Sequence, residues 1–227
     1  MDDRQEPSSM RIAVLGATGA TGRLTVERLL AHDHRVVAVS RSPLREASDE
    51  PRLLSQVGDL TDPAFLRPAI EGCDAIISCL GQNRASRSLF ARRTSPADLL
   101  RRVAEATITA IGGGPQHLIY MSAFGVGADR RRHALLFRVI LRLSSIHAAY
   151  LDHVQAEAAI ARSGIRWTIV RPPGLSDADE EIALVDKSDS WSSFETVSRR
   201  SVAGFLVRCA EQHGPLGGTI TIGAPAS

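Results

Sequence analysis

Gly16-Ala17-Thr18-Gly19-Ala20-Thr21-Gly22 is the stretch that decides the fold of this chain. It stands where an apolar, strand-like run, 10–15, gives way to a helical pattern over 20–31. Glycine permits a tight turn and leaves no side chain between backbone and phosphate, and the free N–H groups at the start of the next helix attract an anion. The GxxGxxG spacing therefore predicts a dinucleotide-phosphate loop. The predicted contacts are Gly16, Thr18, Gly19, Ala20, Thr21 and Gly22. The alternative is a turn whose glycines only allow close packing of strand and helix.

Composition limits the classes of protein to consider. The 227 residues are 44% hydrophobic, enough for one core, so we expect a single domain over 10–227 after a flexible polar tail, 1–9. A formal charge of +2 and 4% aromatic residues give no sign of nucleic-acid binding. No apolar run approaches the roughly 20 residues of a membrane span, and the N-terminus has no secretion pattern. We expect a soluble, cytoplasmic protein.

The three cysteines carry no metal-ligand spacing. Cys73, Cys79 and Cys209 lie in or beside apolar stretches, and no CxxC pattern is present. This usage indicates reduced thiols and no metal site.

Short β-branched runs alternate with helical patterns after the glycine loop. The expected strands cover 35–40, 53–57, 75–80, 117–121 and 167–170, and the expected helices 63–71, 96–111, 152–163 and 198–212. Asp62 before Pro63 and Ser95 before Pro96 are the expected helix starts. The alternation predicts an α/β fold: a Rossmann-like, doubly wound, mostly parallel sheet with helices on both faces. A last run, 219–222, is expected as an edge strand.

Two segments interrupt the alternation, near 123–149 and 172–198. Each follows the carboxyl end of a predicted strand, where open α/β sheets bind their ligands, so both are candidate substrate-site insertions. The alternative is plain surface loops. Within the first, 130–146 has a basic start and one apolar helical face, which favours a lid or a dimer interface over a membrane contact.

The residue after the second strand bears on the choice of cofactor. An NAD-preferring protein places an acidic residue there to hold the ribose 2′-hydroxyl, but this chain reads Ser40-Arg41-Ser42. A guanidinium binds a phosphate through two hydrogen bonds, so Arg41 favours NADP(H) over NAD(H). The candidate helpers are Arg23, Ser40, Ser42 and Arg45. A solvated surface arginine is the alternative.

Two further strand ends are candidate cofactor contacts. Asp59 can accept a hydrogen bond from the adenine amino group with Leu60 against the ring, or it can be only a turn former. Cys79, Leu80 and Gly81 end the fourth strand, where Gly81 allows close approach of the nicotinamide ribose. Gln82 and Asn83 are weaker candidates.

Several motifs together resemble a known superfamily. They are GATGATG (16–22), Arg41, GDLTD (58–62), ISCLG (77–81), YMSAFGVG (120–127) and WTIVRPPGL (167–175). The set resembles the atypical short-chain dehydrogenase/reductase superfamily, in particular its NAD(P)H-binding branch of NmrA-like proteins and the biliverdin reductase B/flavin reductase group. The resemblance runs from about Met10 to the C-terminus. It implies a Rossmann fold that binds NADP(H).

The resemblance also implies site residues. Ser122 matches the serine that binds the substrate carbonyl, and Pro172 and Pro173 match a turn beside the nicotinamide. Arg171, next to that turn, is a candidate substrate contact or a salt-bridge partner within the fold. The YxxxK pair of the superfamily is absent. His153 stands where related chains have lysine, and Tyr150 lies three residues before it. The candidate catalytic residues are therefore Ser122, His153 and Tyr150, with the proton supplied by His153, Tyr150 or water. The alternatives are a core tyrosine, a surface histidine and a structural serine.

The function expected from these features is that of an NADPH-dependent oxidoreductase. It would transfer hydride to a small carbonyl, quinone or flavin-like acceptor, and a conjugated acceptor tolerates the missing YxxxK because it requires no strong protein acid. Two alternatives remain open: a non-catalytic NADP(H)-binding sensor of NmrA type, and a redox-neutral isomerase or cyclase on the same scaffold. The expected partner is a small-molecule substrate, and the protein is either a monomer or a homodimer.

Overall fold

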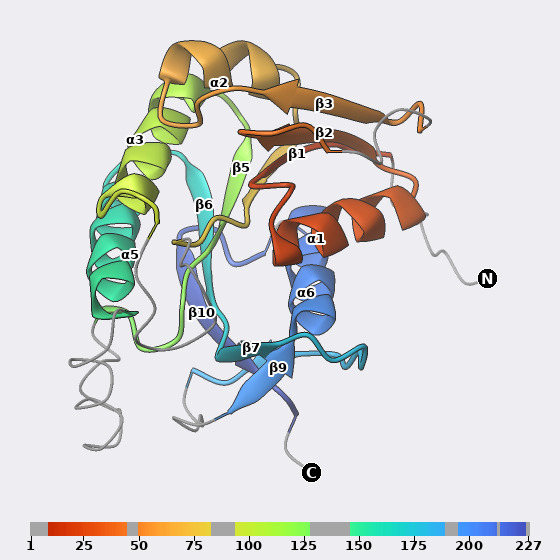
Figure 1. The fold of residues 1–227 in the computed structure, drawn as a ribbon, viewed down its shortest axis with the longest axis vertical. Helices are drawn as coiled ribbons and strands as arrows, with labels where there is room; N and C mark the ends of the chain where they lie inside the picture. Colours follow the sequence, from red (N-terminus) through yellow and green to blue (C-terminus); the bar gives the residue numbers. More distant parts are fainter. Residues whose placement is uncertain are drawn as a thin grey trace.

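An eight-stranded sheet forms the centre of the molecule (Figure 1). The computed structural model describes residues 9–44, 50–82, 94–127, 146–188, 195–212 and 214–225. The strands of this sheet are β1 (Arg11–Leu15), β2 (Arg35–Ser40), β3 (Leu53–Val57), β4 (Ala75–Ser78), β5 (His117–Met121), β6 (Arg166–Arg171), β8 (Val185–Asp186) and β10 (Gly218–Gly223). Their order is β3-β2-β1-β4-β5-β6-β10-β8, and every pairing is parallel except that of β8 with β10. The predicted Rossmann-like, mostly parallel sheet is confirmed.

Helices cover both faces of the sheet (Figure 1). They are α1 (Ala20–Ala31), α2 (Pro63–Ile70), α3 (Leu99–Ile111), α5 (Ile146–Ala161) and α6 (Arg199–Glu211). One core joins α1 and α6 to the sheet face that carries Ile12 and Val14, and the other joins α2, α3 and α5 to the face of Ala13 and Leu15. Successive strand residues point to opposite faces, so a strand buried on both sides is apolar throughout. This explains the unbroken hydrophobic runs.

The strand order places the glycine loop at the reversal point of the sheet. From β1 the chain moves outward through β2 and β3, then returns past β1 to β4 and continues to β5 and β6. The carboxyl ends of β1, β2 and β4 therefore lie side by side. A crevice at such a reversal is the general ligand site of open α/β sheets.

Most predicted elements agree with the structure within two residues, but three predictions were wrong. Helix α3 begins at Leu99, because 97–98 form a turn and Asp98 takes the N-cap position. Helix α5 begins at Ile146, six residues earlier than predicted, since nothing in 146–151 breaks a helix. Strand β10 is not the edge strand, because the two-residue β8 returns beside it.

The segment 172–198 folds partly into structure of its own. Strands β7 (Gly174–Ser176) and β9 (Thr196–Ser198) form a separate parallel pair beyond the carboxyl end of β6 (Figure 1). The predicted amphipathic stretch 130–146 lies almost entirely outside the described residues, as do tail residues 1–8, Arg45 and Asn83.

The three cysteines are free, as predicted, and all three are buried. Burial raises the pKa of the Cys79 and Cys209 thiols to about 12, so both stay protonated. In the described part of the chain, no helix has both the length and the apolar character to cross a membrane.

Candidate cofactor site

The glycine loop turns sharply between β1 and α1. Gly16 has φ +81°, a conformation that L side chains rarely adopt, and its amide donates to Val39 O on the neighbouring strand at 2.9 Å. A Cβ at Gly16 would lie 3.1 Å from the Leu80 side chain. The loop is therefore held between β2 and the residues that follow β4.

The amides at the start of α1 are the donors that this loop offers. The first helical hydrogen bond runs from Arg23 N to Gly19 O at 2.9 Å. The amides of Ala20, Thr21 and Gly22 precede that bond and have no partner within the helix. Gly19 is the N-cap, and no side chain caps the helix there. Backbone donors and the helix dipole at this position suit a pyrophosphate.

The third glycine of the motif has a packing role. A Cβ on Gly22 would lie 2.2 Å from Gly16 O, and one on Gly19 would lie 3.2 Å from the same oxygen. Gly22 is buried. The motif thus combines an anion cradle with close contact between the loop and its helix.

A cleft of about 340 Å³ lies at the carboxyl ends of β1, β2 and β4. Nine predicted cofactor residues line it: Gly16, Thr18, Gly19, Arg41, Asp59, Leu60, Cys79, Leu80 and Gly81. Ala20, Thr21, Gly22, Pro172 and Pro173 are not among its described lining residues. The prolines are buried directly after β6, so their predicted place beside the nicotinamide remains a prediction.

Arg41 and Asp59 form the polar wall of this cleft. Arg41 is exposed, directly after β2. Asp59 Oδ1 accepts hydrogen bonds from both the amide and the hydroxyl of Thr61 at 2.9 Å. Those bonds are the main cause of the lowered pKa of Asp59, with smaller contributions from Arg102 and Arg41. Asp59 is therefore a turn former that also lines the cleft, and its contact with the adenine amino group stays a prediction.

Three further residues line the cleft that no sequence motif indicated. Thr61 lies within GDLTD, and its hydroxyl also accepts from Arg102 at 3.0 Å. Leu99 and Val103 come from the first turns of α3. The spacing i, i+4 places them on one helix face, but no local pattern shows which face meets the cleft.

Ser122 lies buried just beyond β5. Its amide donates to Val170 O at 2.8 Å. Among the described residues, its Oγ has no hydrogen-bond partner. A buried hydroxyl without a partner is costly, and this one stands at the strand ends where ligands bind.

His153 and Tyr150 are not paired with Ser122 in the described part of the chain. Instead, Nδ1 of His153 lies 2.8 Å from the phenol oxygen of Tyr120 on β5. Burial lowers the pKa of His153 to about 4 and raises the pKa of Tyr150 to about 12. At neutral pH His153 is a neutral imidazole held against the core, which makes it a poor proton donor.

Arg171 is a structural partner of α5. Its Nε donates to Glu157 Oε1 at 3.0 Å, and its Nη2 donates to Glu157 Oε2 at 2.6 Å. Both side chains are largely buried. Two parallel bonds of this kind fix the end of β6 against α5, which supports the salt-bridge interpretation of Arg171.

A larger cavity, of about 570 Å³, lies between α1, the first turn of α6 and residues 177–179. Apolar side chains of α1, Leu44 and Leu53 line it, and four of its charged lining residues form two ion pairs. Arg199 binds Asp177 at 2.5 Å, and Arg200 lies 3.5 Å from Glu27. The cleft at the carboxyl ends of β1, β2 and β4 contains the glycine loop. We therefore take that cleft, although it is the smaller of the two, as the cofactor site.

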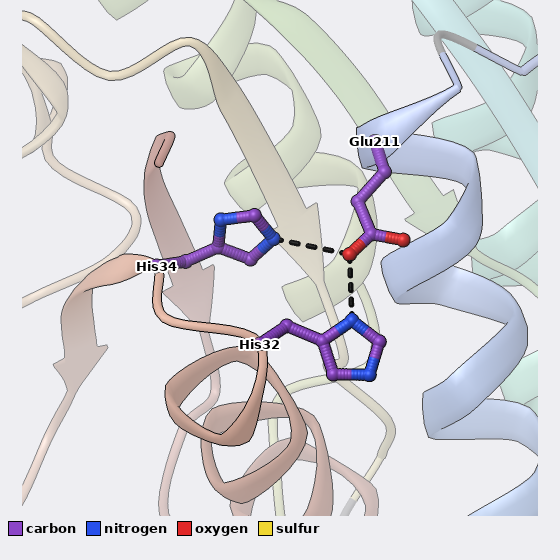
Figure 2. A group of neighbouring side chains, drawn as sticks. All are labelled: His32, His34 and Glu211. Atoms are coloured by element: carbon purple, nitrogen blue, oxygen red, sulfur yellow. Dashed lines mark hydrogen bonds and ion pairs between the residues drawn. The ribbon is translucent and has the colours of Figure 1, made fainter. Parts of the chain in front are cut away.

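Figure 2 shows a cluster formed by His32, His34 and Glu211. No sequence motif indicated this cluster. Oε1 of Glu211 lies 2.7 Å from Nδ1 of His32 and 3.1 Å from Nε2 of His34. The cluster joins the turn after α1 to the last turn of α6. No local pattern predicts this cluster, because the two histidines lie near the N-terminus and Glu211 lies near the C-terminus.

Hydrogen bonding assigns the protons of this cluster. The amide of Met10 donates to Nδ1 of His34 at 3.2 Å, so a neutral His34 carries its proton on Nε2 and donates to Glu211. A metal-bound histidine has the opposite arrangement, with its second nitrogen as a donor. The hydrogen bond from Met10 to His34 therefore favours a protonated, hydrogen-bonded cluster over a metal site.

Comparison with known proteins identifies the family. A family model described as NAD(P)H-binding matches residues 16–213. The chain belongs to this NAD(P)H-binding family. The family model confirms the NAD(P)H-binding part of the predicted resemblance, and with it the binding of a nicotinamide dinucleotide.

Solved structures of NAD(P)-binding proteins share the fold of this family member. A short-chain dehydrogenase/reductase from Veillonella parvula in complex with NADP is 17% identical, with a TM-score of 0.72 over 96% of this chain and 95% of the other. An anaerobillin reductase from Escherichia coli O157:H7 is 21% identical, with a TM-score of 0.73 over 96% of this chain and 98% of the other.

One curated relative of this NAD(P)H-binding protein is the chloroplastic divinyl chlorophyllide a 8-vinyl-reductase of Arabidopsis thaliana. It is 22% identical over 97% of this chain and 55% of its own length. The chain spans between 55% and 66% of the first four curated relatives it matches.

The residues of the cleft fit the cofactor of the family. The amides before Arg23 suit the pyrophosphate, Arg41 suits a 2′-phosphate, and Gly81 leaves open space, since a Cβ there would meet nothing within 4 Å. The cleft also runs in one line from β2 across β1 to β4, as an extended dinucleotide requires.

Proposed function

We propose that this protein is an NADPH-dependent oxidoreductase that reduces a small, conjugated acceptor such as a quinone, a flavin or a tetrapyrrole-derived pigment. The observation that carries the proposal is the buried hydroxyl of Ser122 beyond β5, which has no partner among the residues that the structure describes and lies on the same sheet edge as the cleft. Two of the similar proteins named above are reductases. Cytoplasmic location stays a prediction.

Arg41 supports the choice of NADPH. It is the only charged residue in the run from Ser40 to Ser42, and no carboxylate follows β2 there to bind a ribose 2′-hydroxyl. A guanidinium at this position attracts a 2′-phosphate. Nearby Asp59 has one carboxylate oxygen committed to Thr61, which leaves the other for the adenine amino group.

Ser122 would act on the acceptor. When bound, NADPH supplies a hydride from its nicotinamide ring. The Ser122 hydroxyl would donate a hydrogen bond to the acceptor oxygen or nitrogen that gains negative charge. His153 and Tyr150 are weak acids at neutral pH, so the proton would come from water. A conjugated acceptor spreads the added charge and tolerates this arrangement.

The test is NADPH oxidation, followed at the nicotinamide absorbance, with a panel of quinones, flavins, bilins and aldehydes. We expect turnover with at least one conjugated acceptor. Ser122→Ala should lower kcat by about 100-fold and leave the Kd of NADPH within a factor of about two. A Ser122→Ala variant with full activity would remove Ser122 from the mechanism.

A second candidate is a non-catalytic NADP(H)-binding sensor. It is favoured by one observation, that His153 stands in the expected lysine position and is held neutral against Tyr120. A sensor would bind NADPH with micromolar or better affinity and oxidise none of it with any acceptor in the panel. The same assay therefore separates the two functions.

A further inference from the structure

Asp152 is a buried acidic residue that the proposed chemistry does not use. It lies in the second turn of α5 and is 2% exposed. Its carboxylate accepts three hydrogen bonds, all from N–H groups of other segments. Carboxylates only accept, and a buried one requires such partners.

Two of these bonds cap a different helix. Oδ2 accepts from Leu100 N at 2.8 Å, and Oδ1 accepts from Arg101 N at 2.9 Å. Both amides belong to the first turn of α3, where the N-cap residue Asp98 makes no side-chain cap. Asp152 therefore supplies from α5 the cap that α3 lacks locally, and the helix dipole favours a negative charge there.

The third bond reaches the residue after Gly81. Nε2 of Gln82 donates to Asp152 Oδ2 at 2.9 Å and to Ala97 O at 3.0 Å. Both N–H groups of the Gln82 amide are thus used within the fold. The side chain predicted as a weak cofactor contact instead ties the end of the β4 segment to the segment that leads into α3.

Every partner of Asp152 is joined to a wall of the cofactor cleft. Gly81 precedes Gln82, Leu99 precedes Leu100, and Val103 lies on the same helix; all three line the cleft. One carboxylate therefore holds two walls of the cleft, β4 and α3, in register with α5.

We propose that Asp152 is a positioning residue that sets the width of the NAD(P)H cleft at its β4 side, with Gln82 as its link to Gly81. The proposal rests on cofactor binding by the family and not on the proposed reaction, so cofactor affinity alone tests it.

The strand order predicts which half of the cofactor depends on the Gln82 link. Arg41 follows β2 and Gly81 follows β4, on opposite sides of the glycine loop after β1. The adenosine half of NADPH belongs at Arg41, and the nicotinamide half belongs at Gly81. Loss of the Gln82 link should therefore weaken binding of the whole dinucleotide more than binding of 2′,5′-ADP, which lacks the nicotinamide half.

The first experiment compares Asp152→Asn with wild type by calorimetric titration of NADPH. In either orientation the asparagine amide places an N–H group against at least one backbone donor, so at least one bond is lost. We expect a Kd of NADPH raised by about tenfold. Ser198→Ala is the matched control, because Ser198 caps α6 by accepting from Ser201 N at 3.0 Å and is absent from the described cleft lining. It should lower Tm and leave the Kd within a factor of about two.

The second experiment keeps the proposal testable if Asp152→Asn does not fold. Gln82→Ala leaves both bonds to α3 in place. It should raise the Kd of NADPH by at least about threefold and that of 2′,5′-ADP by less than about twofold. Equal losses for both ligands, or an unchanged Kd of NADPH, would overturn the proposal. Absence of turnover in every variant would bear only on the oxidoreductase function.

Discussion

The phenol oxygen of Tyr120 lies 2.8 Å from Nδ1 of His153, and both side chains are buried between β5 and α5. Burial raises the pKa of Tyr120 well above its usual value and lowers that of His153 to about 4. The pair is therefore neutral at physiological pH. This contact takes the residue in the lysine position out of acid catalysis and makes it part of the core.

The neutral histidine predicts a dependence of stability on pH. Between about pH 6.5 and pH 4, the unfolded chain binds a proton at His153 and the folded chain does not. The free energy of unfolding therefore falls as the pH drops through that window, by up to about 3 kcal/mol from this residue. His153→Gln keeps an acceptor for Tyr120 without a titrating group. Its Tm should fall less than that of wild type between pH 7 and pH 5, and parallel curves for the two proteins would contradict this account.

Arg41→Ala should change the choice of cofactor. Loss of the guanidinium removes the charged partner of the 2′-phosphate, which we expect to raise the Kd of NADPH by about 30-fold and that of NADH by less than threefold. Fluorescence titration measures both. Arg35→Ala, at the opposite end of β2 and also exposed, is the control and should leave both constants unchanged. Equal losses for the two cofactors would show that Arg41 does not contact the 2′-phosphate.

Two glycine substitutions should separate folding from cofactor binding. Gly22→Ala places a Cβ 2.2 Å from Gly16 O, and backbone atoms cannot give way cheaply, so we expect a loss of several kcal/mol of stability or no folded protein. Gly81→Ala meets no atom within 4 Å, and thermal melting should be near wild type. It narrows the cleft, however, and should weaken NADPH binding by about tenfold. Unchanged NADPH binding would place the cofactor away from Gly81.

The cluster in Figure 2 should behave as a hydrogen-bonded contact between α1 and α6. Glu211→Ala leaves the fully buried Nε2–H of His34 without its acceptor, at a cost of about 1–3 kcal/mol. Chemical denaturation measures this loss. Added Zn²⁺ should not raise the Tm of wild type, because Nδ1 of His34 accepts from Met10 N and a metal would need Nε2 unprotonated. A rise in Tm with Zn²⁺ that His34→Ala abolishes would reverse this conclusion.

Local sequence patterns predicted most of the fold, because each buried strand is a short apolar run and each helix shows a helical spacing of apolar residues. The runs over 35–40, 53–57 and 117–121 match β2, β3 and β5 residue for residue, and 20–31 matches α1. The start of α3 could not be predicted in this way. Its cap comes from Asp152, 52 residues beyond Leu100 in the chain, and no local signal carries such a contact.

The residues of the candidate site also fall into those that local sequence patterns predict and those that depend on contacts between distant segments. Glycines with a strand before and a helix after determined that this chain binds a dinucleotide, since that turn depends on backbone conformation and neighbouring residues alone. Only the tertiary structure decided that His153 is bonded to Tyr120, that Ser122 is buried with no partner in the described part of the chain, and that Asp152 bonds to both Gln82 and Leu100. Hydrogen bonds and burial between segments distant in the chain set those properties, and they exist only once the sheet has brought the segments together.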